Sequence, residues 1–216
     1  MPGRSSRVIG TNVRFDADAA VAHLCACDPK LKELIERVGT FRMRLDRATT
    51  PFQALSESII YQQISGRAAE TIAGRFRDRV GEGRFPHPEQ VLEASDTVLR
   101  GAGLSRGKVA ALRDLAAKTL DRTVPSMARL RALEDEEVVE RLIAVRGIGR
   151  WTAEMFLMFR LGRPDVLPVH DYGVRKGFQR TFRRRELPKP ESVARRGERW
   201  RPYRTVASWY LWRSLE

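Results

Sequence analysis

Cysteine is scarce in this chain, and long hydrophobic runs are missing. The 216 residues include two cysteines, Cys25 and Cys27. Two residues apart on an expected helix, their side chains point in different directions, so we expect neither a disulfide nor a metal site there. No apolar run reaches the roughly 18 residues of a membrane-spanning helix, and the start MPGRSSRVIG has no signal-peptide core. We therefore expect a cytoplasmic protein without membrane contact.

Acidic residues and lysines are both few beside the arginines. The chain has 40 Lys+Arg against 27 Asp+Glu, a formal net charge of +13, and six of the basic residues are lysines. Residues 175–204 hold twelve basic residues and three acids, which is about +9 of that charge. A soluble protein this basic usually binds a polyanion. Arginine forks suit phosphate contacts, although a high-GC genome would produce the same arginine bias.

The alternating pattern of β-strands is absent, and nearly every segment has helical periodicity. Asp28 followed by Pro29 predicts a helix that ends at Gly39. A break at Ser65 separates two amphipathic helices within residues 51–80. Further helix N-caps are predicted at Ser95 and Ser105. The predicted fold class is all-α, and the chain has no repeat or low-complexity segment.

The stretch AVRGIGRWTAEMF, residues 144–156, places two glycines one residue apart between two helical segments. EEVVERLIAV is predicted to be the first helix, and RGIG is long enough only for a tight turn. RWTAEMFLMFRLG is predicted to be a second helix that ends at Gly162. The pattern is a helix-hairpin-helix. Gly147 and Gly149 have no Cβ and can adopt positive φ, so we expect accessible backbone N–H groups where the second helix begins. Ile148, between the glycines, is expected to anchor the turn in the core.

A phosphate group fits at such a helix start, because the N–H groups and the helix dipole both attract an anion. The contact would be to the DNA backbone and independent of base sequence. Two glycines alone are better explained by an ordinary turn with a glycine C-cap. The two well-marked flanking helices and the basic composition favour DNA binding.

His170 and Asp171 follow the hairpin in the segment DVLPVHDYGVRKGF, just before another helix. Most aspartates in this position are helix N-caps, and Asp171 alone would be interpreted that way. On a proline-fixed loop after a phosphate-binding turn, however, its carboxylate would face the same DNA strand. A carboxylate beside phosphates is unfavourable unless it meets a developing positive charge, which favours a catalytic role. His170 is expected to be structural, because one His without a partner is a weak metal ligand.

The segment LIAVRGIGRWTAEMFLMFRLGRPDVLPVHDYGVRKGF resembles the signature of the helix-hairpin-helix DNA glycosylase superfamily: a hairpin, a Gly/Pro-rich loop and an aspartate. YQQISGRAA, GLSRGKVAALRDLA and ERWRPYRTVASWYLW are similar in order and spacing to its alkylation-repair branch, DNA-3-methyladenine glycosylase II. The resemblance covers residues 50–213 or so. It implies an all-α fold of two helical subdomains that flank a cleft, in a short form that lacks the N-terminal sheet-containing domain of longer members.

Three segments are expected to build this fold as one compact catalytic unit. Residues 1–50 form an N-terminal helical segment that packs with the C-terminal helices. Residues 51–145 form a helical subdomain that carries the wedge residue. Residues 146–216 contain the hairpin, the catalytic aspartate and the basic, aromatic C-terminal helices.

The resemblance also implies roles for individual residues. Asp171 falls on the catalytic aspartate. The base pocket falls on Trp151, Met155 and Trp212. The DNA-binding hairpin falls on Arg146, Gly147, Ile148, Gly149, Arg150 and Thr152. The wedge that fills the gap left by a flipped-out nucleotide falls on Gln63 and Ile64, where a core isoleucine is an equally good interpretation of Ile64.

Metal and cofactor expectations follow from the same resemblance. Family members hold a monovalent cation, Na⁺ or K⁺, through backbone carbonyls, which would be those of Ile143, Val145 and Ile148 here. Members with an iron–sulfur cluster carry four C-terminal cysteines, which this chain lacks, so no cluster and no required cofactor are expected. Bifunctional members have a nucleophilic lysine at the position of Trp151. Tryptophan has no amine, so the chain should be monofunctional.

The implied activity is hydrolysis of the N-glycosidic bond of alkylated (N3- or N7-methyl) purines in double-stranded DNA, which leaves an abasic site during base excision repair. A cationic alkylpurine is already a good leaving group, so the enzyme has to stabilise the oxocarbenium-like sugar and admit water. The flipped base should stack on indole faces through a cation–π contact worth roughly 0.5–2 kcal/mol. We expect a monomer associated with the nucleoid in the cytoplasm.

Two residues depart from the family pattern. Arg146 stands where proline is common, and Met155 stands where longer members tend to have an aromatic ring. A methionine makes the pocket wall softer, which leaves the range of lesions open.

Three alternatives remain at this stage. One is a non-catalytic helix-hairpin-helix DNA-binding protein, against which Asp171 and Trp151 argue. Another is a glycosylase for a deaminated base such as uracil or hypoxanthine, which would need an acid to activate the leaving group. The third, a basic structural or ribosomal protein, explains the charge but not the hairpin and aspartate together.

Overall fold

A computed structural model of the chain describes residues 12–46 and 50–216, and every regular element within these ranges is a helix. The predicted all-α class is confirmed. The helices form two compact units, described separately below. The terminal unit comprises Met1–Asp46 and Leu157–Glu216, and the hairpin unit comprises Arg47–Phe156.

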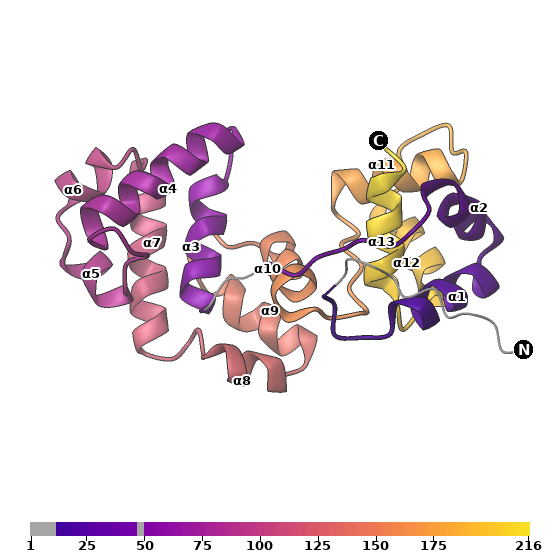
Figure 1. Cartoon of the computed structure of the whole chain (residues 1–216), viewed down its shortest axis with the longest axis horizontal. Helices are drawn as coiled ribbons and strands as arrows, with labels where there is room; N and C mark the ends of the chain where they lie inside the picture. The colour runs from indigo at the N-terminus through magenta and orange to yellow at the C-terminus, as the bar shows by residue number, and fades with distance from the viewer. Residues whose placement is uncertain (1–11, 47–49) are drawn as a thin grey trace, which may run out of the picture. The chain divides into compact units, whose positions relative to one another are not determined.

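The terminal unit brings helices from both ends of the chain together. Its elements are α1 (Ala17–Cys27), α2 (Pro29–Val38), η1 (Leu157–Leu161), α11 (Tyr172–Thr181), α12 (Pro190–Gly197), η2 (Glu198–Trp200) and α13 (Arg204–Arg213). Helix α13 is apolar and buried along most of its length, and it contacts α11 as well as the N-terminal helices α1 and α2 (Figure 1). The N-terminal helices therefore complete the core of this unit.

The hairpin unit is built around α7, which contacts both α3 and α5 (Figure 1). Its elements are α3 (Pro51–Tyr61), α4 (Gly66–Val80), α5 (Pro88–Glu93), α6 (Asp96–Gly101), α7 (Arg106–Leu120), α8 (Met127–Ala132), α9 (Asp135–Ile143) and α10 (Arg150–Phe156). Leu55, Leu112 and Leu115 are fully buried between α3 and its neighbours. Full burial of a leucine side chain contributes about 1.5–3 kcal/mol, so α7 is held firmly in this core.

The helix starts agree with the capping residues read from the sequence. The Asp28 carboxylate accepts a hydrogen bond from the Lys30 N–H at 3.1 Å, and Ser65 caps α4 through the Ala68 N–H. Ser95 and Ser105 cap α6 and α7 in the same way. Such caps typically stabilise a helix by about 1 kcal/mol, because they satisfy an N–H group that has no partner within the helix.

The division into units differs from the predicted segments at the hairpin. The sequence placed a boundary between residues 145 and 146, whereas the hairpin and α10 belong with α3–α9 as far as Phe156. Side chains of Gln62, which follows α3, and of α7 hydrogen-bond to the hairpin backbone and tie it to this unit. Of the N-terminal segment 1–50, residues 1–11 and 47–49 lie outside the described residues.

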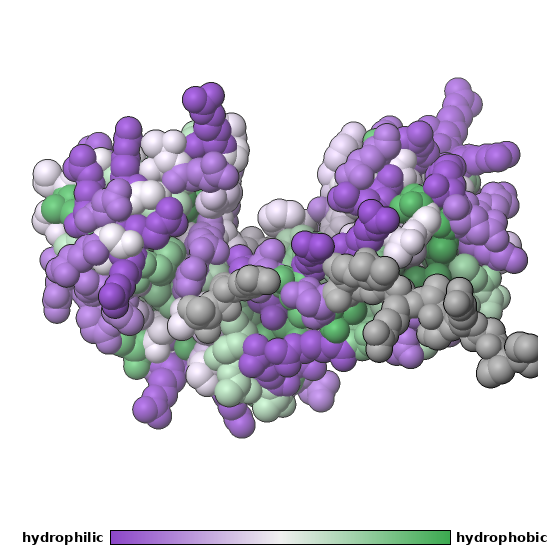
Figure 2. All heavy atoms as spheres, viewed as in Figure 1, coloured by the Kyte–Doolittle hydropathy of each residue, from purple (hydrophilic) through white to green (hydrophobic). Residues whose placement is uncertain are grey.

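Hydrophilic side chains cover most of the face drawn in Figure 2. No helix among the described residues is both long enough and apolar enough to cross a membrane.

Candidate functional site

The hairpin turn lies between the end of α9 at Ile143 and the start of α10 at Arg150. Gly147 has φ +81°, the left-handed conformation that glycine adopts without strain. Ile148 is 5% exposed and its N–H donates to the Val145 carbonyl at 3.1 Å, so it anchors the turn in the core as predicted.

Gly149 is not in the left-handed region, unlike Gly147, so what matters at this position is the missing Cβ rather than a positive φ. A Cβ added to Gly149 would meet no atom of the protein within 4 Å. Among the described residues, the backbone N–H groups of Gly149 and Arg150 have no acceptor. Glycine at this position therefore leaves two N–H groups at a helix start open to an anion.

Two side chains of α7, those of Asp114 and Lys118, hydrogen-bond to the backbone of the hairpin turn. The Asp114 carboxylate accepts from the Arg146 N–H at 2.7 Å and from the Lys118 ammonium at 2.7 Å. Lys118 also donates to the Ala144 carbonyl at 2.6 Å. Burial would raise the pKa of Asp114, but the hydrogen bonds from Arg146 and Lys118 outweigh it and keep that pKa below its usual value. An ionised Asp114 thus fixes the turn, and no local sequence pattern identified it.

The side chains of the predicted hairpin residues differ in their exposure and in their partners. Arg146 is exposed. Arg150 forms an ion pair with Glu136 of α9. Thr152 is only 8% exposed, so its side chain offers little surface to a ligand. The hairpin consequently offers an anion its backbone N–H groups and the Arg146 side chain.

The predicted wedge lies in the turn between α3 and α4. Ile64 is 38% exposed, so it is not a core residue. Gln63 has φ +58°, which is uncommon for a residue other than glycine. Such a conformation costs about 1–3 kcal/mol and persists only where neighbouring contacts impose it.

Asp171 is the N-cap of α11, as its position before the helix predicted. Its Oδ1 atom accepts hydrogen bonds from the Val174 N–H at 2.6 Å and from the Trp212 indole Nε1–H at 2.8 Å. Both donors orient the half-buried carboxylate. A Cβ added to Gly173 would lie 2.8 Å from the Trp212 ring and 3.1 Å from the Asp171 Oδ1 atom, so this glycine makes room for the contact.

Aromatic rings support the same arrangement in the terminal unit. Phe159 stacks on Trp212, with ring centroids 6.0 Å apart and an interplanar angle of 25°. Of the other two predicted pocket residues, Trp151 is 50% exposed and Met155 is half-buried, and both belong to the hairpin unit. The predicted pocket residues therefore come from both units.

Sequence reasoning missed Gly173, Phe159, Asp114 and Lys118. Gly173 could have been noticed, because a glycine inside a helix costs about 0.5–1 kcal/mol relative to alanine and usually marks a close approach. The other three residues have no local signature, because their partners are distant in the sequence.

Comparison with known proteins identifies the family of the chain. Residues 57–202 match the profile of the HhH-GPD superfamily base excision DNA repair proteins. The chain belongs to this family. It is 35% identical over 196 residues to DNA-3-methyladenine glycosylase 1 of Schizosaccharomyces pombe, covering 90% of this chain and 86% of that protein.

Two solved structures of the family have the same fold. A DNA-3-methyladenine glycosidase from Bacillus halodurans superposes with a TM-score of 0.82 at 38% identity, covering 92% of this chain and 90% of that one. The Schizosaccharomyces pombe 3-methyladenine DNA glycosylase (Mag1), in complex with abasic DNA, superposes with a TM-score of 0.78 at 34% identity. This second match covers 90% of this chain and 95% of that one.

Proposed function

We propose that this protein is a monofunctional DNA glycosylase of base excision repair, which hydrolyses the N-glycosidic bond of alkylated purines and leaves an abasic site. The observation that carries the proposal is the Asp171 carboxylate, half-buried and oriented by the Val174 N–H and the Trp212 indole. Relatives of the protein are named DNA-3-methyladenine glycosylase or glycosidase, which supports 3-methyladenine as a substrate, and we propose N7-methylpurines as further substrates.

The reaction needs little more than a fixed negative charge and a water molecule. A methylated purine carries a positive charge, so the C1′–N bond breaks with its electron pair passing to the base. The sugar then becomes an oxocarbenium ion, which the Asp171 carboxylate stabilises electrostatically. Water adds to C1′ and loses its proton to the carboxylate or to solvent, which leaves the abasic sugar and an intact backbone.

The hairpin unit binds the backbone of double-stranded DNA. The open N–H groups of Gly149 and Arg150 bind a backbone phosphate at the start of α10, which contributes affinity for any sequence. Ile64, exposed in its turn, fills the gap in the base stack when the damaged nucleotide is flipped out. Trp151 and Trp212 stack on the electron-poor base, with Met155 as a softer part of the pocket wall.

Trp151 also limits the chemistry to base release. Its indole has no nucleophilic amine, so no Schiff base forms with the sugar and the DNA strand is not cleaved. The reaction needs no cofactor, and with two cysteines in the chain no iron–sulfur cluster is held.

The carbonyls of Ile143, Val145 and Ile148 fit a structural Na⁺ or K⁺, since they are neutral oxygen donors on a tight turn. The Val145 carbonyl accepts the Ile148 N–H and keeps a second lone pair. Such a cation would add positive charge beside the phosphate that the hairpin binds. We further propose that the protein acts as a monomer in the cytoplasm, associated with the nucleoid.

Release of free bases from methylated duplex DNA tests the proposal. We expect free alkylpurines, with strand breaks only after alkali treatment. Breaks without alkali would contradict the monofunctional assignment. Salt-sensitive binding without release of methylated bases, uracil or hypoxanthine would instead identify a non-catalytic DNA-binding protein. Release of uracil or hypoxanthine alone would identify a glycosylase for deaminated bases.

A further inference from the structure

Lys108 of α7 caps the end of α3. Its half-buried ammonium group donates to the Ile60 carbonyl at 2.7 Å and to the Gln62 carbonyl at 2.9 Å. Burial lowers the pKa of Lys108 from its usual value. A long cationic side chain that reaches 46 residues back along the chain to two helix-end carbonyls fixes the path of the backbone there.

The second of these carbonyls, that of Gln62, begins the wedge turn, which comprises residues 62–65. Gln63 adopts its left-handed conformation directly after the carbonyl that Lys108 holds, and the exposed Ile64 comes next. Lys108 therefore fixes the carbonyl of the residue directly before this costly conformation.

Gln62 connects the wedge turn to the hairpin. Its side-chain Nε2–H donates to the Gly147 carbonyl at 2.9 Å, across 85 residues of sequence. Gly147 is the left-handed glycine of the hairpin turn. A side chain of the wedge turn is therefore hydrogen-bonded directly to the backbone of the hairpin.

Helix α7 supports both turns at once. Lys108, near its start, holds the wedge turn, whereas Asp114 and Lys118, further along, hold the hairpin. Two segments that are far apart in sequence thus contact the same helix and are linked to each other by Gln62.

We propose that Lys108 and Gln62 are positioning residues that couple wedge insertion to phosphate binding, so that Ile64 enters the base stack only at the register set by the hairpin. This inference rests on the proposed function. Neither residue touches the reacting atoms, and both act through the position of Ile64.

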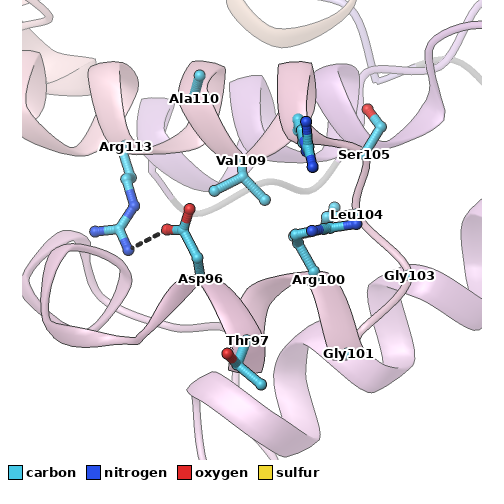
Figure 3. Close-up of a pocket in the computed structure, with 11 residues that line it drawn as sticks. Asp96, Thr97, Arg100, Gly101, Gly103, Leu104, Ser105, Val109, Ala110 and Arg113 are labelled. Carbon is cyan, nitrogen blue, oxygen red and sulfur yellow. Dashed lines mark hydrogen bonds and ion pairs between the residues drawn. The ribbon is translucent and has the colours of Figure 1, made fainter.

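The test compares Lys108→Met and Gln62→Met with the matched control Arg113→Met. Arg113 is also on α7, and it pairs with Asp96 (Figure 3). It also donates to the Leu92 and Ala94 carbonyls, and none of these partners belongs to either turn. We expect single-turnover base release at saturating protein to fall about tenfold in Lys108→Met, because small errors in positioning are costly. Lys108→Arg should recover most of the rate, and Arg113→Met should release base at the wild-type rate.

A double-mutant cycle with Ile64→Ala separates coupling from general damage to the fold. If Lys108 acts through the wedge, Lys108→Met should change the rate less than about twofold once Ile64 is alanine, since the two effects then share one cause. A full tenfold loss in the Ile64→Ala background, or no loss in the wild-type background, would overturn the proposal.

A binding readout distinguishes this proposal from the proposed function. The fluorescence of 2-aminopurine placed next to an uncleavable abasic-site analogue in duplex DNA reports unstacking by the wedge, without any base release. We expect a smaller signal for Lys108→Met and Gln62→Met than for Arg113→Met at equal saturation. If the variants gave this pattern while the wild-type protein released no base, the proposed function would be contradicted and the coupling would stand. Equal signals from all three variants would refute the coupling.

Discussion

Two aspartates of the terminal unit begin helices in the same way and stand in different surroundings. Asp28 caps α2 through the Lys30 N–H and accepts the Trp200 indole Nε1–H at 2.9 Å. Asp171 caps α11 through the Val174 N–H and accepts the Trp212 indole at 2.8 Å. The local motif, an N-cap aspartate with a tryptophan donor, is therefore shared.

The difference between them lies in burial. Asp28 is 0% exposed and is bound by the Arg196 guanidinium through two hydrogen bonds of 2.7 and 2.8 Å. Burial alone would raise its pKa, but the hydrogen bonds from Arg196 and Trp200 outweigh this and hold the pKa of Asp28 below its usual value. Asp171, in contrast, is only half-buried. The comparison teaches that one capping motif serves stability at Asp28 and, as we propose, chemistry at Asp171.

Removal of the Asp28 carboxylate should have the largest effect on stability. Asp28→Ala removes the cap of α2, leaves the buried Trp200 indole N–H without its acceptor and takes the ion-pair partner from the partly exposed Arg196, which together should cost about 2–4 kcal/mol. Urea unfolding should show this loss, whereas Glu36→Ala, an exposed change on α2, should leave the midpoint unchanged. An Asp28→Ala midpoint equal to that of the wild type would show that the two aspartates do not differ as described.

Exchange of each tryptophan donor sharpens the same contrast. Trp212→Phe keeps a ring that can stack on Phe159 but removes the hydrogen bond to Asp171. We expect base release at saturating protein to slow about tenfold, the equivalent of roughly 1.4 kcal/mol. Trp200→Phe should lower the unfolding midpoint and leave the rate of base release intact. Single-turnover kinetics and thermal melts of both variants measure this, and a reversed pattern would contradict it.

Local capping chemistry made much of the fold predictable. Ser65 and Ser105 start helices where the sequence indicates, because the cap bonds span only three residues. The pair of Asp28 and Arg196 was not predictable, since 168 residues separate them. The π-helical turn η1 at Leu157–Leu161 was also missed, because no sequence pattern distinguishes it from ordinary helix.

The candidate site was predictable to a similar degree. Asp171 and the hairpin glycines were found from their local pattern and the family resemblance. The supports at Lys108, Gln62 and Asp114 could not be found, because each holds a backbone group distant in sequence. A buried Thr152 and an Arg150 paired with Glu136 likewise depend on tertiary packing.

The two hairpin glycines provide a smaller contrast between stability and function. Gly147→Ala should destabilise the fold by about 1–2 kcal/mol, because φ is +81° and alanine adopts that conformation with strain. Gly149→Ala should leave the fold intact, since its Cβ meets no protein atom, and should weaken DNA binding several-fold for all sequences. Melting curves and titrations with duplexes of different sequence check both. A loss of affinity confined to one sequence would contradict backbone recognition.

The smallest effect concerns acid. The pKa of Asp28 is lower in the folded than in the unfolded chain, so its ionised form stabilises the fold above the unfolded value of about 4, and this contribution is lost as the pH falls through the folded value. Asp28→Asn, which cannot ionise, should show a flatter fall in unfolding free energy than the wild type between about pH 4 and pH 2. Parallel curves for the two proteins would mean that Asp28 contributes nothing to acid sensitivity.

The most direct measurement of the central claim is single-turnover base release from methylated duplex DNA by Asp171→Asn at saturating protein. Asparagine keeps the shape of the side chain and its Oδ1 acceptor for Val174 and Trp212 but removes the negative charge. We predict unchanged DNA affinity and a rate at least about 100-fold lower than that of the wild type, because the charge that stabilises the sugar cation is gone. Base release by Asp171→Asn at the wild-type rate would contradict the catalytic role of Asp171.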